Sequence, residues 1–250
     1  MKVYDGANIR NVAIAGHSGS GKTQLASAIL FDAGMVNRLG KVDEGNTVTD
    51  FDEEAIARKH TLSASLAYAE WNKTKINLVD TPGFGNFFSD SRSALRVADA
   101  ALVVIDSVSG PEVQTEKVWQ EAEAIGLPCM VVFSRMDRER ASLARTLEAT
   151  QAAFGRMVVP VQMPIGEEKQ FQGIVDLVSM KAYTFATDGS GKMTETPVPA
   201  DMAEQAKASR EALVEMGVAT ESDIGWALAR QMGIPFIDLI PETLDHALIN

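Results

Sequence analysis

The chain has one cysteine, no long apolar run and few basic residues. A single Cys129 among 250 residues excludes an internal disulfide and any zinc site built from a cysteine cluster. No apolar run approaches the roughly 20 residues that a membrane helix needs. The first ten residues, MKVYDGANIR, lack the apolar core of a signal peptide. We therefore expect no membrane contact and a cytoplasmic protein.

Basic residues are fewer than acidic ones, with 23 Lys and Arg against 34 Asp and Glu and a formal net charge of −11. Binding of nucleic-acid phosphates needs a dense basic surface, so direct DNA binding is not expected. The imbalance is uneven, because residues 1–157 hold 17 basic and 20 acidic residues, whereas residues 158–250 hold 6 and 14. A hydrophobic fraction of 46% with 23% charged residues excludes a disordered or fibrous chain.

Short apolar runs alternate with helical patterns through the first 157 residues. Four runs are expected to form buried strands: 11–15, 75–79, 101–105 and 129–133. Four segments have helical spacing: 22–33, 88–98, 113–125 and 141–154. Strands that are apolar throughout belong in a sheet covered on both faces, and their alternation with helices favours parallel pairing. The predicted fold is α/β, with a mostly parallel sheet and flanking helices.

The pattern changes after residue 158. Three segments follow that resemble a proline-interrupted stretch, a strand and a helix: 159–165, 171–177 and 203–216. A turn is expected at 188–192, and a small helix–strand unit after residue 217. We therefore predict three parts: an α/β domain over 1–157, a partial α+β insert over 158–216 and a C-terminal unit over 217–250.

Residues 16–23, GHSGSGKT, fit the phosphate-binding pattern G-x-x-x-x-G-K-[ST] between a predicted strand and a predicted helix. Its glycines let successive backbone N–H groups surround a phosphate, and the helix N-terminus adds positive potential. Lys22 is expected to reach the β- and γ-phosphates, and the Thr23 hydroxyl to hold Mg²⁺. The predicted nucleotide-binding residues are Gly16, His17, Ser18, Gly19, Ser20, Gly21, Lys22 and Thr23.

Two further motifs, DTPG and SRMD, follow predicted strands. Asp80 ends its strand, where a carboxylate beside a phosphate loop can hold Mg²⁺ through water, and the Gly83 N–H can reach a γ-phosphate. Asp137 can accept two hydrogen bonds from the N1–H and N2 amino groups of guanine, which adenine cannot supply. The predicted binding residues of the two motifs are Asp80, Thr81, Pro82, Gly83, Ser134, Arg135, Met136 and Asp137.

The order and spacing of the three motifs resemble translational GTPases, and elongation factor G in particular. The resemblance covers about residues 7–215 and includes the stretches 113–119 and 161–182. It implies a GTP-binding domain over 1–157, part of the family's insert after it, and a GTP-driven switch acting on the ribosome. GTP or GDP and Mg²⁺ are the implied ligands, and the resemblance adds Thr61 to Thr23 and Asp80 as a Mg²⁺ residue.

Two features of the site depart from the family pattern. Phe84 stands where the family has a histidine that orients the attacking water, so no catalytic residue is assigned and slow intrinsic hydrolysis is expected. Phe84 is either part of an apolar gate or a structural ring, and nothing in the sequence directs nearby His60 at a water. Ser134 and Arg135 replace the usual Asn and Lys. The shorter Ser134 can lose a tie to the phosphate loop, whereas Arg135 can lie across the base.

The third departure is that the resemblance ends near Met216, before the strand and Ser-Ala loop that close over the base in the family. Residues 217–250 resemble half of the N-terminal module of type II secretion and type IV pilus ATPases, or they form a plain helix and strand that pack on the main domain. A natural fusion and a joined chain both remain open, and this segment is a candidate for contact with another protein. The alternative function is a non-catalytic interaction module with weakened nucleotide binding, while Asp137 disfavours an ATP-using enzyme.

Overall fold

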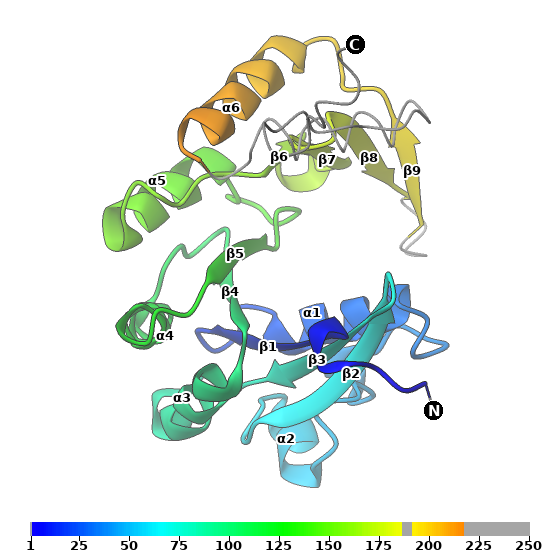
Figure 1. Ribbon diagram of the computed structural model, residues 1–250, viewed down its shortest axis with the longest axis vertical. Coiled ribbons are helices and arrows are strands. Elements are labelled where there is room, and N and C mark those ends of the chain that lie inside the picture. The colour runs from blue at the N-terminus through cyan, green and yellow to red at the C-terminus, as the bar shows by residue number, and fades with distance from the viewer. Residues whose placement is uncertain (1, 187–191, 218–250) are drawn as a thin grey trace, which may run out of the picture. The chain divides into compact units, whose positions relative to one another are not determined.

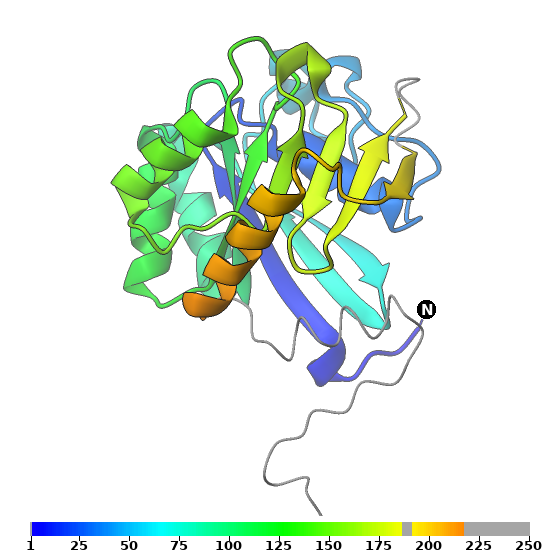
Figure 2. The same ribbon diagram turned by 90° about the horizontal axis from the view of Figure 1, so that it is seen from above.

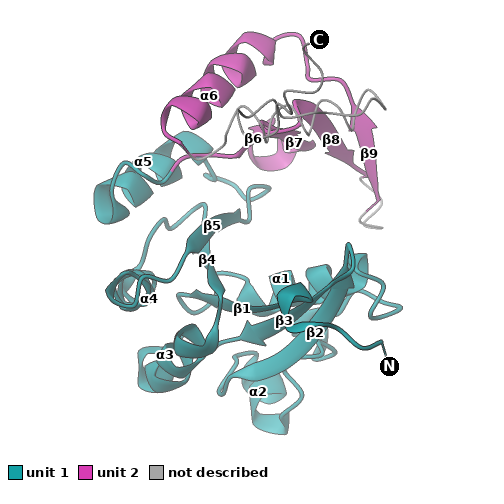
Figure 3. Ribbon diagram, viewed as in Figure 1, with its two compact units in different colours: residues 1–158 teal, residues 159–250 magenta. Residues whose placement is uncertain are grey.

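The computed structural model describes residues 2–186 and 192–217, and the chain divides into two compact units, residues 1–158 and 159–250 (Figure 3). Each unit has a sheet of its own, with five strands in the first and four in the second. Within the described ranges, no helix combines the length and the apolar character needed to cross a membrane.

The first unit is built on a mixed sheet with the strand order β2-β3-β1-β4-β5 (Figure 1). Its strands are β1 (Ile9–Gly16), β2 (Ser65–Trp71), β3 (Thr74–Asp80), β4 (Ala100–Asp106) and β5 (Cys129–Ser134). β1 pairs in parallel with β3 and β4, and β4 pairs in parallel with β5. The ends of these parallel strands therefore meet at one edge of the sheet, where the three sequence motifs begin.

Helices cover both faces of this sheet, as Figures 1 and 2 show. They are α1 (Lys22–Asp32), α2 (Glu53–Arg58), α3 (Phe88–Val97), α4 (Val113–Ala124) and α5 (Leu143–Phe154). On β1, Ala13 and Ala15 pack in a core cluster with residues of α3 and α4, whereas Ile14 packs in a second cluster with α1. Because alternate residues of a strand point to opposite faces, this two-sided burial explains why the second half of β1, residues 12–16, has no polar side chain.

The predicted α/β fold is confirmed, with two additions. All four predicted strands and all four predicted helices of residues 1–157 are present within a few residues of their expected bounds. β2, which pairs antiparallel with β3, and the short helix α2 were not predicted. β2 buries the small side chains of Ser65, Ala67 and Ala69, while Leu66 and Tyr68 point outward and are exposed. This inversion of the usual alternation gives no apolar inward face for a sequence pattern to detect.

In its described residues, the second unit has a four-stranded antiparallel sheet and one long helix, which matches the expected α+β part. Its elements are β6 (Gln162–Ile165), β7 (Gly173–Asp176), β8 (Lys181–Phe185), β9 (Met193–Thr196) and α6 (Ala203–Glu215). Val175 and Leu177 form its core with Ala206 and Leu213 of α6. β8 and β9 were not predicted. The expected turn at 188–192 and the unit over 217–250 lie, apart from Lys192 and Gly217, outside the described residues.

Four single-turn 3-10 helices complete the described secondary structure. They span Gly6–Asn8, Val42–Glu44, Gly85–Phe87 and Glu168–Gln170. The third of these follows Phe84 directly and leads into α3, so the DTPG motif is joined to α3 without a long loop.

Candidate functional site

The phosphate loop connects the end of β1 to the start of α1, and its glycines are required by its shape. Gly16 has φ 144°, and a Cβ there would lie 2.4 Å from the carbonyl oxygen of Val104. Gly21 caps α1 with φ 96°. Side chains other than hydrogen are excluded or strained at both positions, so the loop passes close to β4 and delivers the N-terminus of α1 to the site. Helix N-termini of this kind bind phosphate.

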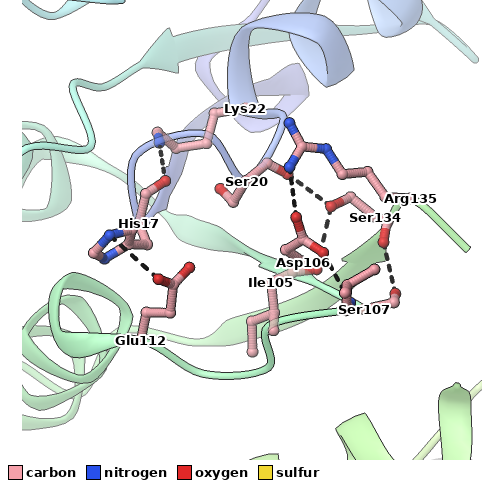
Figure 4. A network of polar contacts seen from close by, with 10 residues as sticks. His17, Ser20, Lys22, Ile105, Asp106, Ser107, Glu112, Ser134 and Arg135 are labelled. Carbon is pink, nitrogen blue, oxygen red and sulfur yellow. Dashed lines mark hydrogen bonds and ion pairs between the residues drawn. The ribbon is translucent and has the colours of Figure 1, made fainter. Parts of the chain in front are cut away.

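Lys22 is buried at the first position of α1, with 5% of its surface exposed. Its Nζ donates a hydrogen bond to the His17 carbonyl at 2.7 Å, as Figure 4 shows. Burial lowers the pKa of Lys22 to about 8, and the negative charges of Asp80 and Asp50 oppose that shift. A charged ammonium in this position is incompletely compensated, and a phosphate would supply the missing negative charge.

Three side chains with oxygen donors, Thr23, Thr61 and Asp80, come together close to Lys22. The hydroxyls of Thr23 and Thr61 are 2.9 Å apart, although 38 residues separate them in sequence. Thr49 donates to Asp80 Oδ2 at 2.8 Å, whereas Asp80 Oδ1 is buried and has no hydrogen-bond partner among the described residues. Burial raises the pKa of Asp80 to about 6. Hydroxyl and carboxylate oxygens are ligands that Mg²⁺ accepts, so Thr23, Thr61 and Asp80 fit this ion.

The rest of the DTPG motif fixes the loop after β3 against β1 and the phosphate loop. Thr81 donates from both its backbone N–H and its hydroxyl to the Ile14 carbonyl, and Ser91 donates to the Pro82 carbonyl at 2.9 Å. At Gly83 a Cβ would lie 2.5 Å from both Lys22 Nζ and the Ser18 nitrogen. Glycine is therefore needed for the close approach, which brings this motif to the phosphate-binding residues.

The SRMD motif follows β5 and is anchored by its first two residues (Figure 4). Ser134 Oγ donates to the Ser20 carbonyl at 2.7 Å, so the tie to the phosphate loop that the shorter side chain could have lost is present. Arg135 Nη1 forms an ion pair with Asp106 Oδ2. The guanidinium is thus held at the end of β4, and its expected place across a base stays a prediction. Asp137 is exposed in the same loop.

Two contacts at the site were invisible in the sequence. The buried Asp50 has a raised pKa, mainly because of its burial, with a hydrogen bond from Thr61 and the charges of Lys22 and His60 acting in the opposite direction. His17 Nε2 lies 3.5 Å from Glu112 Oε1, and the Gln114 N–H donates to His17 Nδ1 at 3.4 Å. Asp50 and Glu112 belong to no motif that the sequence analysis singled out, and the contacts of His17 join residues more than 90 positions apart in the chain.

Phe84 comes directly after Gly83, and its side chain is 39% exposed. Its ring contacts the imidazole of His60 edge to face, with ring centroids 4.8 Å apart and planes at 82°. Phe84 is thus in contact with a histidine that comes from another loop.

Comparison with known proteins agrees with this geometry. Residues 7–221 match the family model of the elongation factor Tu GTP-binding domain. The chain is 39% identical over 230 residues to an elongation factor G-like protein of Mycobacterium tuberculosis, covering 92% of the chain and 31% of that protein. It is 35% identical over 214 residues to elongation factor G of Mycoplasma pneumoniae, covering 86% and 31%.

A crystal structure of a Thermus thermophilus protein superimposes with a TM-score of 0.79 at 34% identity, over 97% of this chain and 35% of that one. The chain thus spans about a third of the length of these relatives. The phosphate loop, the DTPG loop and the SRMD loop lie at one edge of a mostly parallel sheet. Together with these matches, they show that the chain belongs to the elongation factor Tu GTP-binding domain family, with elongation factor G and its like-named relatives as similar members.

Proposed function

We propose that the chain binds GTP and GDP together with Mg²⁺ and acts as a GTP-driven switch of the elongation factor G type. One observation carries the proposal: Asp80 keeps a buried carboxylate oxygen without a partner among the described residues, beside Lys22 and the paired hydroxyls of Thr23 and Thr61. A buried, unsatisfied oxygen costs free energy, and a magnesium-bound triphosphate would relieve it. When bound, Mg²⁺ neutralises developing charge on the β- and γ-phosphates.

Guanine is the proposed base because Asp137 stands in the loop that Ser134 ties to the phosphate loop. The proposed nucleotide-binding set is the one predicted from the three motifs. When nucleotide binds, Arg135 either leaves Asp106 and lies along the base, or it keeps the ion pair with Asp106 and holds the SRMD loop in place. ATP offers no donor pair for Asp137, so an ATP-using enzyme is disfavoured.

Hydrolysis is proposed to be slow, because Phe84 has no atom that accepts a hydrogen bond from the attacking water. Its replacement by histidine should raise the single-turnover rate, and a rate unchanged in both Phe84→Ala and Phe84→His would remove Phe84 from any role in hydrolysis.

The ribosome is the proposed partner and the cytoplasm the proposed location, both from family membership. We also propose that residues 1–157 are the GTP-binding domain and 158–216 part of its insert. Residues 217–250 are proposed to be a half-module like that of secretion and pilus ATPases, which contacts another protein. Deletion of 218–250 should then leave GTP affinity unchanged, and a loss of affinity would instead assign this segment to the nucleotide site.

Equilibrium titration with labelled GTP, GDP and ATP tests the main proposal, and ATP binding as tight as GTP binding would remove the guanine assignment. Thermal unfolding with and without Mg-GTP separates the proposal from its rival, the interaction module with weakened nucleotide binding. A ligand at 100 times its Kd stabilises a protein by roughly 2.7 kcal/mol. A clear upward shift supports nucleotide binding, whereas no shift favours the interaction module.

A further inference from the structure

The ring contact between His60 and Phe84 joins two loops of the site. His60 follows α2, where Lys59 adopts a left-handed conformation with φ 56° and turns the chain back. The His60 N–H donates to the Ala55 carbonyl at 3.1 Å, so its backbone is fixed to the end of the helix. Its side chain is exposed, and the edge-to-face contact with Phe84 is its defined ring partner.

Both rings are next to residues that face the phosphates. Thr61, which follows His60, has its hydroxyl 2.9 Å from that of Thr23. Gly83, which precedes Phe84, approaches Lys22 Nζ so closely that no Cβ fits. Each ring therefore belongs to a residue that adjoins, in the chain, a residue proposed to contact the γ-phosphate or its Mg²⁺, and the imidazole is exposed to water.

The two side chains differ in what they can do there. Phe84 cannot donate or accept a hydrogen bond, whereas an imidazole nitrogen can accept one from water. An edge-to-face ring pair is attractive, and it favours one orientation of the two rings relative to each other. A phenylalanine at this position is thus suited to hold a histidine that comes from the neighbouring loop.

We propose that His60 is the catalytic residue that holds the attacking water in this chain, and that Phe84 positions its ring. The proposal rests on the proposed function, GTP binding and hydrolysis. The slow hydrolysis that we propose for a chain without a histidine at residue 84 then depends on His60.

The step itself is the hydrolysis of GTP to GDP and phosphate. The water oxygen forms a bond to the γ-phosphorus while the bond from that phosphorus to the β,γ-bridging oxygen breaks. GDP leaves with the electron pair of that bond. One proton of the water passes to an oxygen of the inorganic phosphate that forms, and the other stays on the oxygen that attacked. A His60 ring nitrogen accepts a hydrogen bond from the water, and this contact keeps a lone pair of the water oxygen directed at the phosphorus. His60 carries no additional proton at the end of the reaction.

Single-turnover hydrolysis of Mg-GTP by the full chain tests the proposal. His60→Ala should lower the rate by about 10- to 100-fold, while the Kd for GTP, measured separately, changes by less than about twofold. His60→Gln, whose amide oxygen can also accept from water, should keep a substantial part of the rate. Phe84→Leu, which retains an apolar side chain but loses the ring contact, should slow hydrolysis by a few-fold. Ser63→Ala, an exposed change in the same loop, is the matched control and should have no effect.

A second variant guards against an indirect effect on folding. In the double variant Phe84→His, His60→Ala the histidine is returned to the family position, and hydrolysis should recover to at least the wild-type rate. Thermal unfolding of each variant should stay near wild type, because His60 is exposed.

Three results would overturn the proposal. The first is wild-type hydrolysis in His60→Ala at unchanged GTP affinity. The second is a rate lost in Gln114→Ala but not in His60→Ala, since the Gln114 amide also lies close to the chain at Gly85 and would then hold the water. The third is a chain that binds GTP without hydrolysing it. Failure to bind GTP at all would in addition remove the proposed function, so the two failures are distinguishable.

Discussion

The proposed phosphate end of the site (Lys22, Thr23, Thr61 and Asp80) and its proposed base end (Ser134, Arg135 and Asp137) differ in how deeply their side chains are buried. At the phosphate end, Lys22 and Thr61 are 5% and 8% exposed and Asp80 is fully buried, and their side chains are linked to neighbours. At the base end, Asp137 is exposed and Arg135 is paired with Asp106. The charges proposed to bind phosphate are therefore buried, whereas the carboxylate proposed to select the base is exposed.

The sheet explains the difference. The phosphate loop and DTPG follow β1 and β3, which pair at the centre of the sheet. The SRMD loop, residues 134–137, follows β5, which is the edge strand among the five described strands of this unit. A central strand end is packed from both sides, and an edge is packed from one. The affinity for the nucleotide should therefore depend on buried charges at the phosphate end, and on contacts that exposed side chains make to the base at the base end.

The largest effect is expected at the phosphate end, from Lys22→Ala. Hydrogen bonds to charged groups contribute about 1.5–3 kcal/mol each, and Lys22 is placed to make such bonds to two phosphates. The Kd for GTP and for GDP should rise by about 100-fold or more, measured by titration with labelled nucleotide. Lys41→Ala, a change at an exposed lysine, is the control. An equal loss in both variants would mean that general positive charge, rather than the buried ammonium, binds the phosphates.

At the base end, Asp137→Asn should change which nucleotide is bound. A bidentate contact to a base edge is worth about 1–3 kcal/mol of discrimination, so GTP affinity should fall by about 10- to 100-fold. Xanthosine triphosphate, which carries a carbonyl in place of the guanine amino group, should bind better to the variant than to wild type. Competition of both nucleotides against labelled GDP measures this exchange. A loss of affinity for both nucleotides would show that the two ends are not separable.

A smaller effect is expected in the stability of the ligand-free chain, from Asp80→Asn. Burial raises the folded-state pKa of Asp80 to about 6, above the ordinary value near 3.9. A raised carboxyl pKa gives stability that is present below about pH 4 and is lost as the pH rises through 6. Wild type should thus lose on the order of 2 kcal/mol relative to the variant between pH 4 and 7.

Denaturant unfolding of both chains in the presence of a metal chelator measures that difference. Adding Mg-GTP at pH 7 should reverse the order, because only wild type then gains a ligand for the carboxylate. If the free energies of unfolding of wild type and Asp80→Asn change with pH in the same way, burial does not raise the pKa of Asp80, and this prediction is wrong.

Local sequence patterns were sufficient to predict the strands and loops that form both ends of the site. The contacts between those loops could not be predicted, because they join residues far apart in the chain. Apolar runs located β1, β3, β4 and β5, and the motifs located the loops that follow three of them. What the sequence missed depends on partners far apart in the chain: the Arg135 ion pair with Asp106 and the burial of Asp50. No periodicity encodes such pairs, because they arise only when strand order brings the loops together. The Ser134 tie to Ser20 is the same kind of contact, and sequence comparison alone left it open.

The smallest predicted effect concerns that tie, which physically joins the two ends. Ser134→Ala removes the donor to the Ser20 carbonyl, and a hydrogen bond of this kind contributes about 1 kcal/mol. GTP affinity should therefore fall by about fivefold, with the ratio of GTP to ATP affinity preserved because Asp137 is unchanged. Ser109→Ala, at an exposed serine, is the control for the titration. The contrary result is that Ser134→Ala lowers the ratio of GTP to ATP affinity as much as Asp137→Asn does. Ser134 would then fix the position of the Asp137 side chain, and base selection would depend on the hydrogen bond between the two ends of the site.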